Sequence, residues 1–181
     1  MYKINILLKQ DQKIFHTRDL AILWQITNPN TLYTTIKRYV KSGILIQVQK
    51  GLYSVIPLKQ IDPVRLGLSL IHDYAYLSAE TVLVKAGIIF QSSNYITLIS
   101  NKSKRLNSFE NYYLIRQMKN QFLYNSLGIE DKNGIKTASL ERAVADLLYF
   151  NPKFYFDNQK AINWKLVKKI QKEVGFFGRY S

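Results

Sequence analysis

Apolar residues at the start of the chain recur with the spacing of helices rather than of strands. In the stretch YKINILLK, residues 2–9, Ile4, Leu7 and Leu8 fall on one face of a short predicted helix. A second helix is predicted from Thr17, a residue type that favours the N-cap, with Asp19 in its first turn. Two successive amphipathic helices are therefore expected before residue 27.

The stretch TNPNTLYTTIKRYVKSG, residues 27–43, predicts a third helix with both of its ends marked. Asn28 is the expected N-cap, Pro29 takes the first helical position, where its missing N–H costs nothing, and Gly43 suits a left-handed end. Between these ends the apolar positions keep helical spacing. They form one predicted buried stripe, made of Leu32, Ile36, Tyr39 and Val40.

The next thirteen residues, ILIQVQKGLYSVI at 44–56, predict a β-hairpin. Two runs rich in β-favouring residues flank Lys50-Gly51, which gives the hairpin a short basic tip. Three helices followed by a hairpin is the element order of a winged helix-turn-helix. The segment PLKQIDP, residues 57–63, has a proline at each end and reads as a linker. We therefore place the domains at 1–58 and 59–181.

The second part of the chain mixes helical and extended patterns. Helices are predicted at 64–71, 78–86, 139–150 and 163–174, with Ser139 as the cap of the third. Strands are predicted at 95–100, 111–118 and 121–125, and a short extended piece at 134–138, although 111–118 is also compatible with a helix. The predicted class is α+β, with an N-terminal winged helix-turn-helix domain followed by a mixed α+β domain.

The net charge of the chain indicates which class of molecule it binds. The 181 residues hold 26 Lys and Arg against 12 Asp and Glu, a formal net charge of +14. A surplus of this size suggests a polyanionic partner: DNA, RNA or an anionic membrane surface. Cysteine is absent, which excludes disulfides and thiolate metal sites. No apolar run reaches transmembrane length and the first residues are too polar for a signal peptide, so a soluble cytoplasmic protein is expected.

The third predicted helix carries polar and basic side chains on its outward face. A recognition helix in the DNA major groove needs this division, with short amide and hydroxyl groups for base edges and cations for phosphates. Backbone N–H groups at its start are further candidates for a phosphate, and Lys50 for the backbone beside the adjacent groove. The alternative is an ordinary solvated helix face. The predicted DNA-binding residues are Thr17, Asn28, Asn30, Thr31, Tyr33, Thr34, Lys37, Arg38, Lys41 and Lys50.

Catalytic patterns are weak throughout the sequence. His16 precedes the Thr17 cap and reads as structural, while His72 and Asp73 are neighbours whose side chains would point apart in a helix. The acidic residues form no metal motif, and no glycine-rich phosphate loop is present. We therefore expect a non-enzymatic protein with no catalytic residue, no metal and no cofactor.

Two basic clusters and one charge pair stand out after residue 60. Lys102, Lys104 and Arg105 follow a predicted strand, and either they or the last helix could extend a nucleic-acid surface or meet an acidic partner. That helix carries Lys165, Lys168, Lys169 and Lys172 on one face. Arg142 and Asp146 are four residues apart on a predicted helix and can form a salt bridge. Such a salt bridge contributes little to stability if it is exposed.

Three stretches together resemble the AbiEi-type antitoxins of bacterial type IV (AbiE) toxin–antitoxin systems. They are VKSGILIQVQKGLYSV (40–55), YAYLSAETVLVKAGII (74–89) and KTASLERAVADLL (136–148). The last is similar to the family's Ser-Pro-Glu-Arg-Ala-Leu-Leu-Asp helix, with Leu140 at the proline position and Val144-Ala145 at the two leucines.

The resemblance implies a transcriptional repressor that binds operator repeats in its own promoter. It also implies a second domain that counters a nucleotidyltransferase-like toxin without a stable complex. The candidate residues of that domain are the basic cluster and three residues of the 136–148 stretch: Lys102, Lys104, Arg105, Glu141, Arg142 and Asp146. Three alternatives stay open: a stand-alone winged-helix regulator, an RNA-binding or RNA-modifying protein, and an adaptor for an acidic protein.

Overall fold

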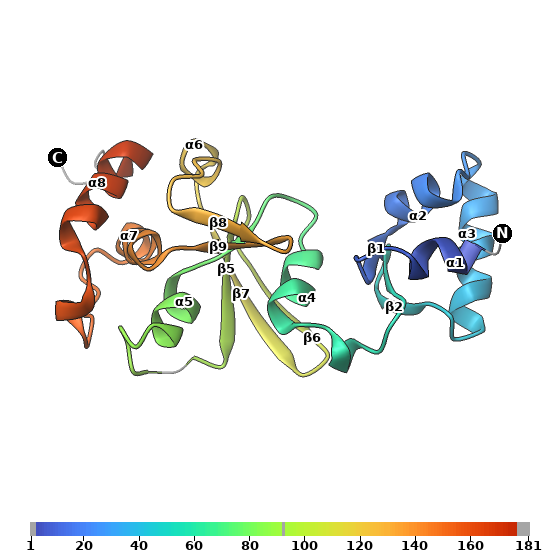
Figure 1. Ribbon diagram of the computed structural model, residues 1–181, viewed down its shortest axis with the longest axis horizontal. Helices are drawn as coiled ribbons and strands as arrows, with labels where there is room; N and C mark the ends of the chain where they lie inside the picture. The colour runs from blue at the N-terminus through green and yellow to red at the C-terminus, as the bar shows by residue number, and fades with distance from the viewer. Residues whose placement is uncertain (1–2, 92, 177–181) are drawn as a thin grey trace. The chain divides into compact units, whose positions relative to one another are not determined.

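The computed structural model describes residues 3–91 and 93–176, and its chain forms two compact units, residues 1–70 and 71–181 (Figure 1). Residues 59–70, which the sequence reading assigned to the second domain, therefore belong to the first unit. Together the units make a mixed α+β protein, the class that the sequence predicts. Tyr2, the first residue of the first predicted helix, lies outside the described residues.

The first unit combines helices with a small antiparallel sheet. Its helices are α1 (Lys3–Leu8), α2 (Thr17–Trp24), α3 (Pro29–Lys41), a 3-10 turn η1 (Leu58–Gln60) and α4 (Pro63–Ser69). Its strands are β1 (Ile14–His16), β2 (Ile46–Gln49) and β3 (Leu52–Ser54). The predicted hairpin is β2–β3. Strand β1, which the sequence pattern does not predict, pairs with β3 and gives the order β1-β3-β2.

The core of this unit is built from the apolar faces of the three helices. Leu7, Leu20, Leu32 and Ile36 lie in one cluster with Phe15 of β1. Burying each such side chain contributes about 1.5–3 kcal/mol, so the inward stripes of the helices determine which faces point out.

Two local predictions in the first unit are wrong. The N-cap of α2 is His16, whose backbone N–H donates to Asp19 Oδ2 at 2.8 Å, and Thr17 is the first helical residue. Leu8, which the sequence reading placed on the inner face of α1, is 57% exposed.

The second unit is centred on a six-stranded mixed sheet of order β6-β7-β5-β4-β9-β8. The strands are β4 (Tyr76–Leu77), β5 (Tyr95–Ser100), β6 (Lys104–Ser108), β7 (Asn111–Gln117), β8 (Ile129–Lys132) and β9 (Ile135–Ala138). The predicted strands at 95–100 and 111–118 are confirmed, with the second ending one residue early. The short polar strands β6 and β8 were not predicted.

Helices pack beside this sheet in the order α5, α7, α8, as Figure 1 shows. Their bounds are α5 (Ala79–Lys85), α6 (Asn120–Leu123), α7 (Leu140–Phe150), η2 (Gln159–Ala161) and α8 (Trp164–Val174). Ser139 caps α7 as predicted, through a bond from the Arg142 N–H. The strand predicted at 121–125 is wrong: α6 is there because Phe122 and Leu123 are both buried, and a strand would send these neighbours to opposite faces.

None of the helices in the described part of the chain is long and apolar enough to cross a membrane.

Candidate nucleic-acid interface

Helix α3 begins at a fully formed cap. The side-chain oxygen of Asn28 accepts from the backbone N–H groups of Asn30 and Thr31 at 2.9 and 3.2 Å, and Pro29 has no N–H to offer. The next N–H, on Leu32, donates to the carbonyl of Asn28. The start of α3 therefore has no spare N–H group for a phosphate, which corrects that expectation, and the amide oxygen of Asn28 is committed to the cap.

The inner and outer faces of α3 differ sharply in their exposure to solvent. Leu32 and Ile36 are buried as predicted, and Thr35 joins them because its hydroxyl donates to the Thr31 carbonyl at 2.8 Å. The outward residues are all exposed: Asn30, Thr31, Tyr33, Thr34, Lys37, Arg38 and Lys41. The predicted contact residues on α3 thus share one solvent-facing surface, here called the α3 face.

In the part of the chain that the structure describes, no carboxylate forms an ion pair with a cation of the α3 face. Asp11 and Asp19 are the acids among residues 1–60, and Asp19 accepts the His16 N–H on another helix. Lys37, Arg38 and Lys41 take part in none of the ion pairs found among the described residues. Lys37, Arg38 and Lys41 therefore present positive charge to solvent, as phosphate-binding cations do.

The hairpin tip is fixed to the start of α2. The backbone N–H of Thr17 donates to the Gly51 carbonyl at 2.9 Å, and its hydroxyl reaches the same oxygen at 3.3 Å. Gly51 has φ +81°, which a side-chain residue adopts only with strain. Lys50 beside it is exposed. Thr17, half-buried and bonded in this way, positions the tip, whereas Lys50 is available to a partner.

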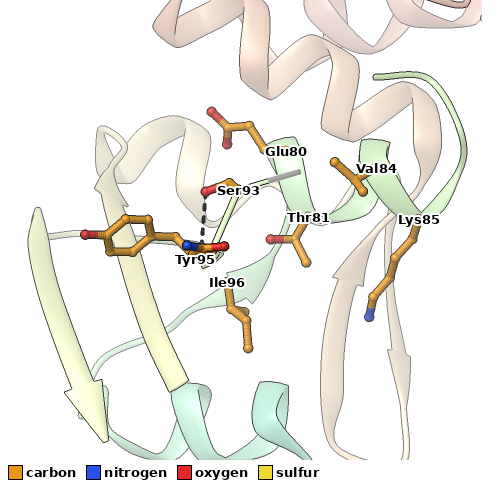
Figure 2. A pocket seen from close by; sticks show the side chains of 8 residues that line it. Glu80, Thr81, Val84, Lys85, Ser93, Tyr95 and Ile96 are labelled. Carbon is orange, nitrogen blue, oxygen red and sulfur yellow. Dashed lines mark hydrogen bonds between the residues drawn. The ribbon is translucent and has the colours of Figure 1, made fainter. Parts of the chain in front are cut away.

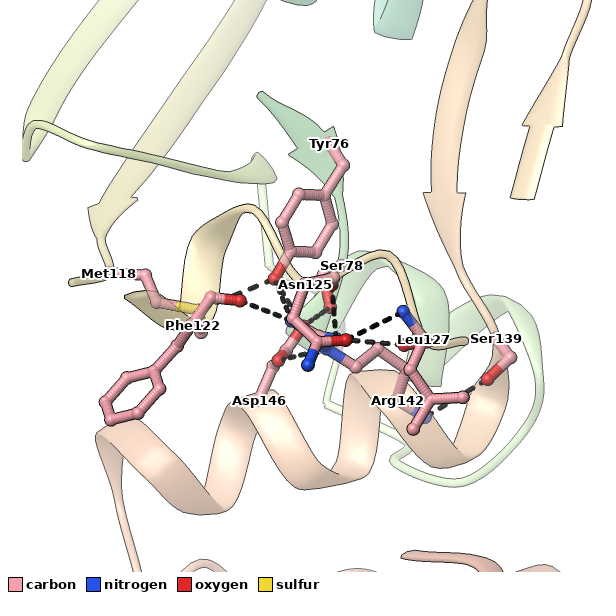
Figure 3. A network of polar contacts seen from close by, with 9 residues as sticks. All are labelled: Tyr76, Ser78, Met118, Phe122, Asn125, Leu127, Ser139, Arg142 and Asp146. Atoms are coloured by element: carbon pink, nitrogen blue, oxygen red, sulfur yellow. Dashed lines mark hydrogen bonds and ion pairs between the residues drawn. The ribbon is translucent and has the colours of Figure 1, made fainter. Parts of the chain in front are cut away.

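The second unit holds a buried polar network centred on Arg142 and Asp146, both 0% exposed (Figure 3). Arg142 Nε donates to Asp146 Oδ1 at 2.8 Å, while Asp146 Oδ2 accepts from Ser78 Oγ at 2.8 Å and from the Tyr76 hydroxyl at 3.1 Å. Two members come from α7 and two from the β4–α5 region. The network therefore ties the helix to the sheet.

The Arg142 guanidinium has an acceptor for each of its five N–H groups. Besides Asp146, it donates to the Tyr76 hydroxyl and to the carbonyls of Phe122, Asn125 and Leu127. Three of these acceptors lie in the 122–127 segment that joins α6 to β8. This one side chain therefore holds an otherwise irregular loop against α7.

Burial dominates the acid–base behaviour of the network. It raises the pKa of Tyr76 well above the ordinary value, and the nearby Asp146 adds to the shift, so the phenol stays protonated and donates. Burial also raises the pKa of Asp146 against the opposing effects of Arg142, Ser78 and Tyr76. For Arg142, burial is the largest effect and lowers the pKa, but the charge attraction and hydrogen bonds of Asp146 and Tyr76 together outweigh it and the pKa is raised.

The residues expected to act in the second unit do not form one surface. Arg142 and Asp146, two of the candidate residues of this unit, are enclosed and cannot touch a partner in this conformation. Glu141 is half-buried in the first turn of α7. Lys102 forms a surface ion pair with Asp73 at 3.3 Å. Lys104 and Arg105 are the first two residues of β6. The lysines of α8 are exposed as predicted, with Lys169 3.8 Å from Glu173.

Comparison with known proteins identifies a structure with a similar fold but no family to which the chain can be assigned. No protein-family model matches the sequence, and no curated protein matches it significantly. Among solved structures, the chain is similar to the crystal structure of the RV2827C protein from Mycobacterium tuberculosis, with a TM-score of 0.56. The match covers 93% of this chain and 69% of that one at 13% sequence identity. This likeness shows a shared fold and nothing about activity.

Proposed function

We propose that the first unit is a winged helix-turn-helix domain that binds a specific duplex DNA sequence. The observation that carries the proposal is the α3 face: seven exposed polar, aromatic or cationic side chains with no acid among them. Helix α3 enters the major groove, and the β2–β3 hairpin is the wing. The order of helices and hairpin supports this arrangement.

Each part of the α3 face has a separate role. Asn30 and Thr34, near the start of the helix, meet base edges and provide sequence preference. Lys37, Arg38 and Lys41 meet phosphates and provide affinity that falls with added salt. The exposed Lys50 at the wing tip contacts the backbone beside the adjacent groove.

The whole chain acts as a cytoplasmic, non-enzymatic repressor and as the antitoxin of an AbiE-like type IV system. In this role the first unit binds operator repeats in the protein's own promoter. The second unit counters a nucleotidyltransferase-like toxin without forming a stable complex. This part of the proposal rests on the resemblance of three sequence stretches to the AbiEi family.

DNA binding is tested by fluorescence anisotropy with labelled duplex from just upstream of the gene, against a scrambled duplex at physiological salt. We expect the native fragment to bind on the order of a thousandfold more tightly. A variant with Asn30, Thr34, Lys37 and Arg38 all changed to alanine should lose this preference. The matched control removes two cations elsewhere, Lys165→Ala with Lys168→Ala on α8. Equal affinity for both duplexes, or a quadruple variant that binds like the wild type, would refute the proposed surface.

The antitoxin activity needs its own experiment. A nucleotidyltransferase-like gene beside this one is expressed with and without the protein, and growth is recorded. Rescue by the wild type and by the quadruple DNA-binding variant would support a separate antitoxin role of the second unit. Growth arrest that the protein does not relieve leaves a stand-alone regulator as the function.

A further inference from the structure

Three strands at one side of the six-stranded sheet carry an exposed tyrosine surface. In the parallel pair β5–β7, Tyr95 lies beside Tyr112, and in the antiparallel pair β6–β7, Tyr112 lies opposite Asn107. Residues that pair across strands share a face, and so do residues two positions further along a strand. Arg105, two residues before Asn107, is therefore on the same face. Tyr95, Tyr112, Asn107 and Arg105 are here called the tyrosine platform.

The side chains of the platform touch one another. The ring centroids of Tyr95 and Tyr112 are 6.1 Å apart at an interplanar angle of 66°, and the Arg105 guanidinium carbon lies 6.0 Å from the Tyr95 centroid. Tyr112 is 52% exposed and Tyr95 is half-buried, so both rings are accessible to a partner. In Figure 2 the Tyr95 ring points away from Thr81 and Lys85.

The platform is positively charged. Within the described residues, Arg105 has no acid within ion-pair distance. The acid nearest in sequence is Glu110, in the turn between β6 and β7. Arg116, on β7, is already paired with Glu80. The aromatic rings of the platform are thus bordered by a cation, Arg105, that no carboxylate of the described residues neutralises.

A hollow of about 180 Å³ adjoins the platform (Figure 2). It is lined by Glu80, Thr81, Val84, Lys85, Ser93, Asn94, Tyr95 and Ile96. The volume is below the ~300–1,000 Å³ of sites that enclose a drug-sized ligand, so it suits one ring or one sugar. Tyr95 belongs to both surfaces, and the exposed Lys85 adds a cation at the far side of the hollow.

We propose that the tyrosine platform and its hollow bind single-stranded nucleic acid. Unpaired bases stack on aromatic side chains laid out on a sheet, and cations beside them hold the phosphates. Successive bases stack on Tyr112 and Tyr95, Arg105 meets a phosphate, and the hollow receives the next base or its sugar. A duplex hides its base faces and would engage only the cations. An acidic peptide would likewise leave the tyrosines without a role. This site is independent of the α3 face.

The first test measures anisotropy of a labelled twelve-nucleotide oligouridine, the matching oligothymidine and a twelve-base-pair duplex with the full-length protein. Tyr112→Ala should weaken oligonucleotide binding about 5- to 150-fold, the usual range for one base–aromatic stack, while Tyr112→Phe keeps it. Tyr124→Ala is the matched control because Tyr124 is 56% exposed in the same unit. Arg105→Ala should weaken binding more than Lys168→Ala on α8 does.

The results separate this site from the proposed DNA surface. The quadruple α3 variant should bind both oligonucleotides like the wild type, whether or not duplex binding proves specific. Tighter binding of oligouridine would identify contacts to the ribose 2′-hydroxyl, and equal binding would identify stacking and phosphate contacts that both strands share. Oligonucleotide binding that the quadruple variant abolishes, or that Tyr112→Ala and Tyr124→Ala affect equally, would overturn the proposal.

A measurement on the unaltered protein covers the case in which Tyr112→Ala does not fold. Oligouridine that carries 4-thiouridine is cross-linked with near-ultraviolet light, and the adducts are mapped by mass spectrometry. Adducts on Tyr95, Tyr112 or residues 104–107 are expected. Adducts confined to the first unit would overturn the platform as the binding site.

Discussion

Removing the carboxylate of Asp146 should destabilise the second unit severely. Asp146 is 0% exposed and accepts three hydrogen bonds, one of them from Arg142, which is equally buried. Asp146→Ala leaves the guanidinium charge without a counter-ion in a place that water does not reach. Breaking a buried pair in this way costs about 3–5 kcal/mol, more than a typical point mutation.

The chain contains its own control for this argument. Lys169 and Glu173 form a second pair with the same four-residue spacing on a helix, but their side chains are 64% and 48% exposed and the charges are 3.8 Å apart. Lys169→Ala should cost at most about 0.5 kcal/mol. The two variants remove one member from pairs of the same spacing in the same unit, so their difference measures the effect of burial.

Urea unfolding followed by tryptophan fluorescence gives the free energies. The sequence has two tryptophans, and Trp24→Phe leaves Trp164 to report on the second unit. With a slope of about 2 kcal/mol per molar urea, a loss of about 4 kcal/mol lowers the midpoint by about 2 M. If Asp146→Ala lowers the midpoint no more than Lys169→Ala does, the argument from burial is wrong.

Three further predictions concern the first unit. Lys37→Ala and Arg38→Ala should each reduce the slope of log affinity against log salt by about 1, measured by anisotropy from about 50 to 200 mM salt; unchanged slopes would exclude phosphate contacts. Asn30→Ala or Thr34→Ala should cost about 1–3 kcal/mol on the preferred duplex and little on a scrambled one, and an equal loss on both would exclude base reading. Asn28→Ala should cost about 0.5–2 kcal/mol of stability through the lost cap, read from Trp24 fluorescence during unfolding in a Trp164→Phe background, with Asn28→Asp as the variant that keeps the cap.

Local signals were enough to predict the parts of the fold that depend on neighbouring residues. The cap at Asn28, the first-turn Pro29 and the cap at Ser139 all act within three or four residues, and the structure has each of them. The inward stripe of α3 follows from helical spacing alone. Its outward face was predictable for the same reason, because the buried positions determine which residues remain outside.

Features set by distant residues were missed or misjudged. Strand β1 has three residues and exists because β3 pairs with it, and the edge strand β6 is too polar to show an alternating pattern. The tyrosine platform depends on the parallel register of Tyr95 with Tyr112, which no local spacing shows. Threonine favours the N-cap position, which is why Thr17 was predicted as the cap of α2. The hydrogen bond from the His16 N–H to Asp19 instead makes His16 the N-cap.

The buried pair shows how little helical spacing says about the surroundings of a side chain. Spacing alone predicted that Arg142 and Asp146 pair, but not that Tyr76, Ser78 and the 122–127 segment enclose them. Loss of the proposed antitoxin activity on changing either residue alone is therefore expected to reflect lost folding. The double change Arg142→Met with Asp146→Leu removes both charges and fills similar volume, so it leaves no buried charge without a counter-ion. If that double variant folds and still protects cells, the pair is structural; if it folds and fails to protect, Arg142 or Asp146 acts directly in function and the interpretation from burial is refuted.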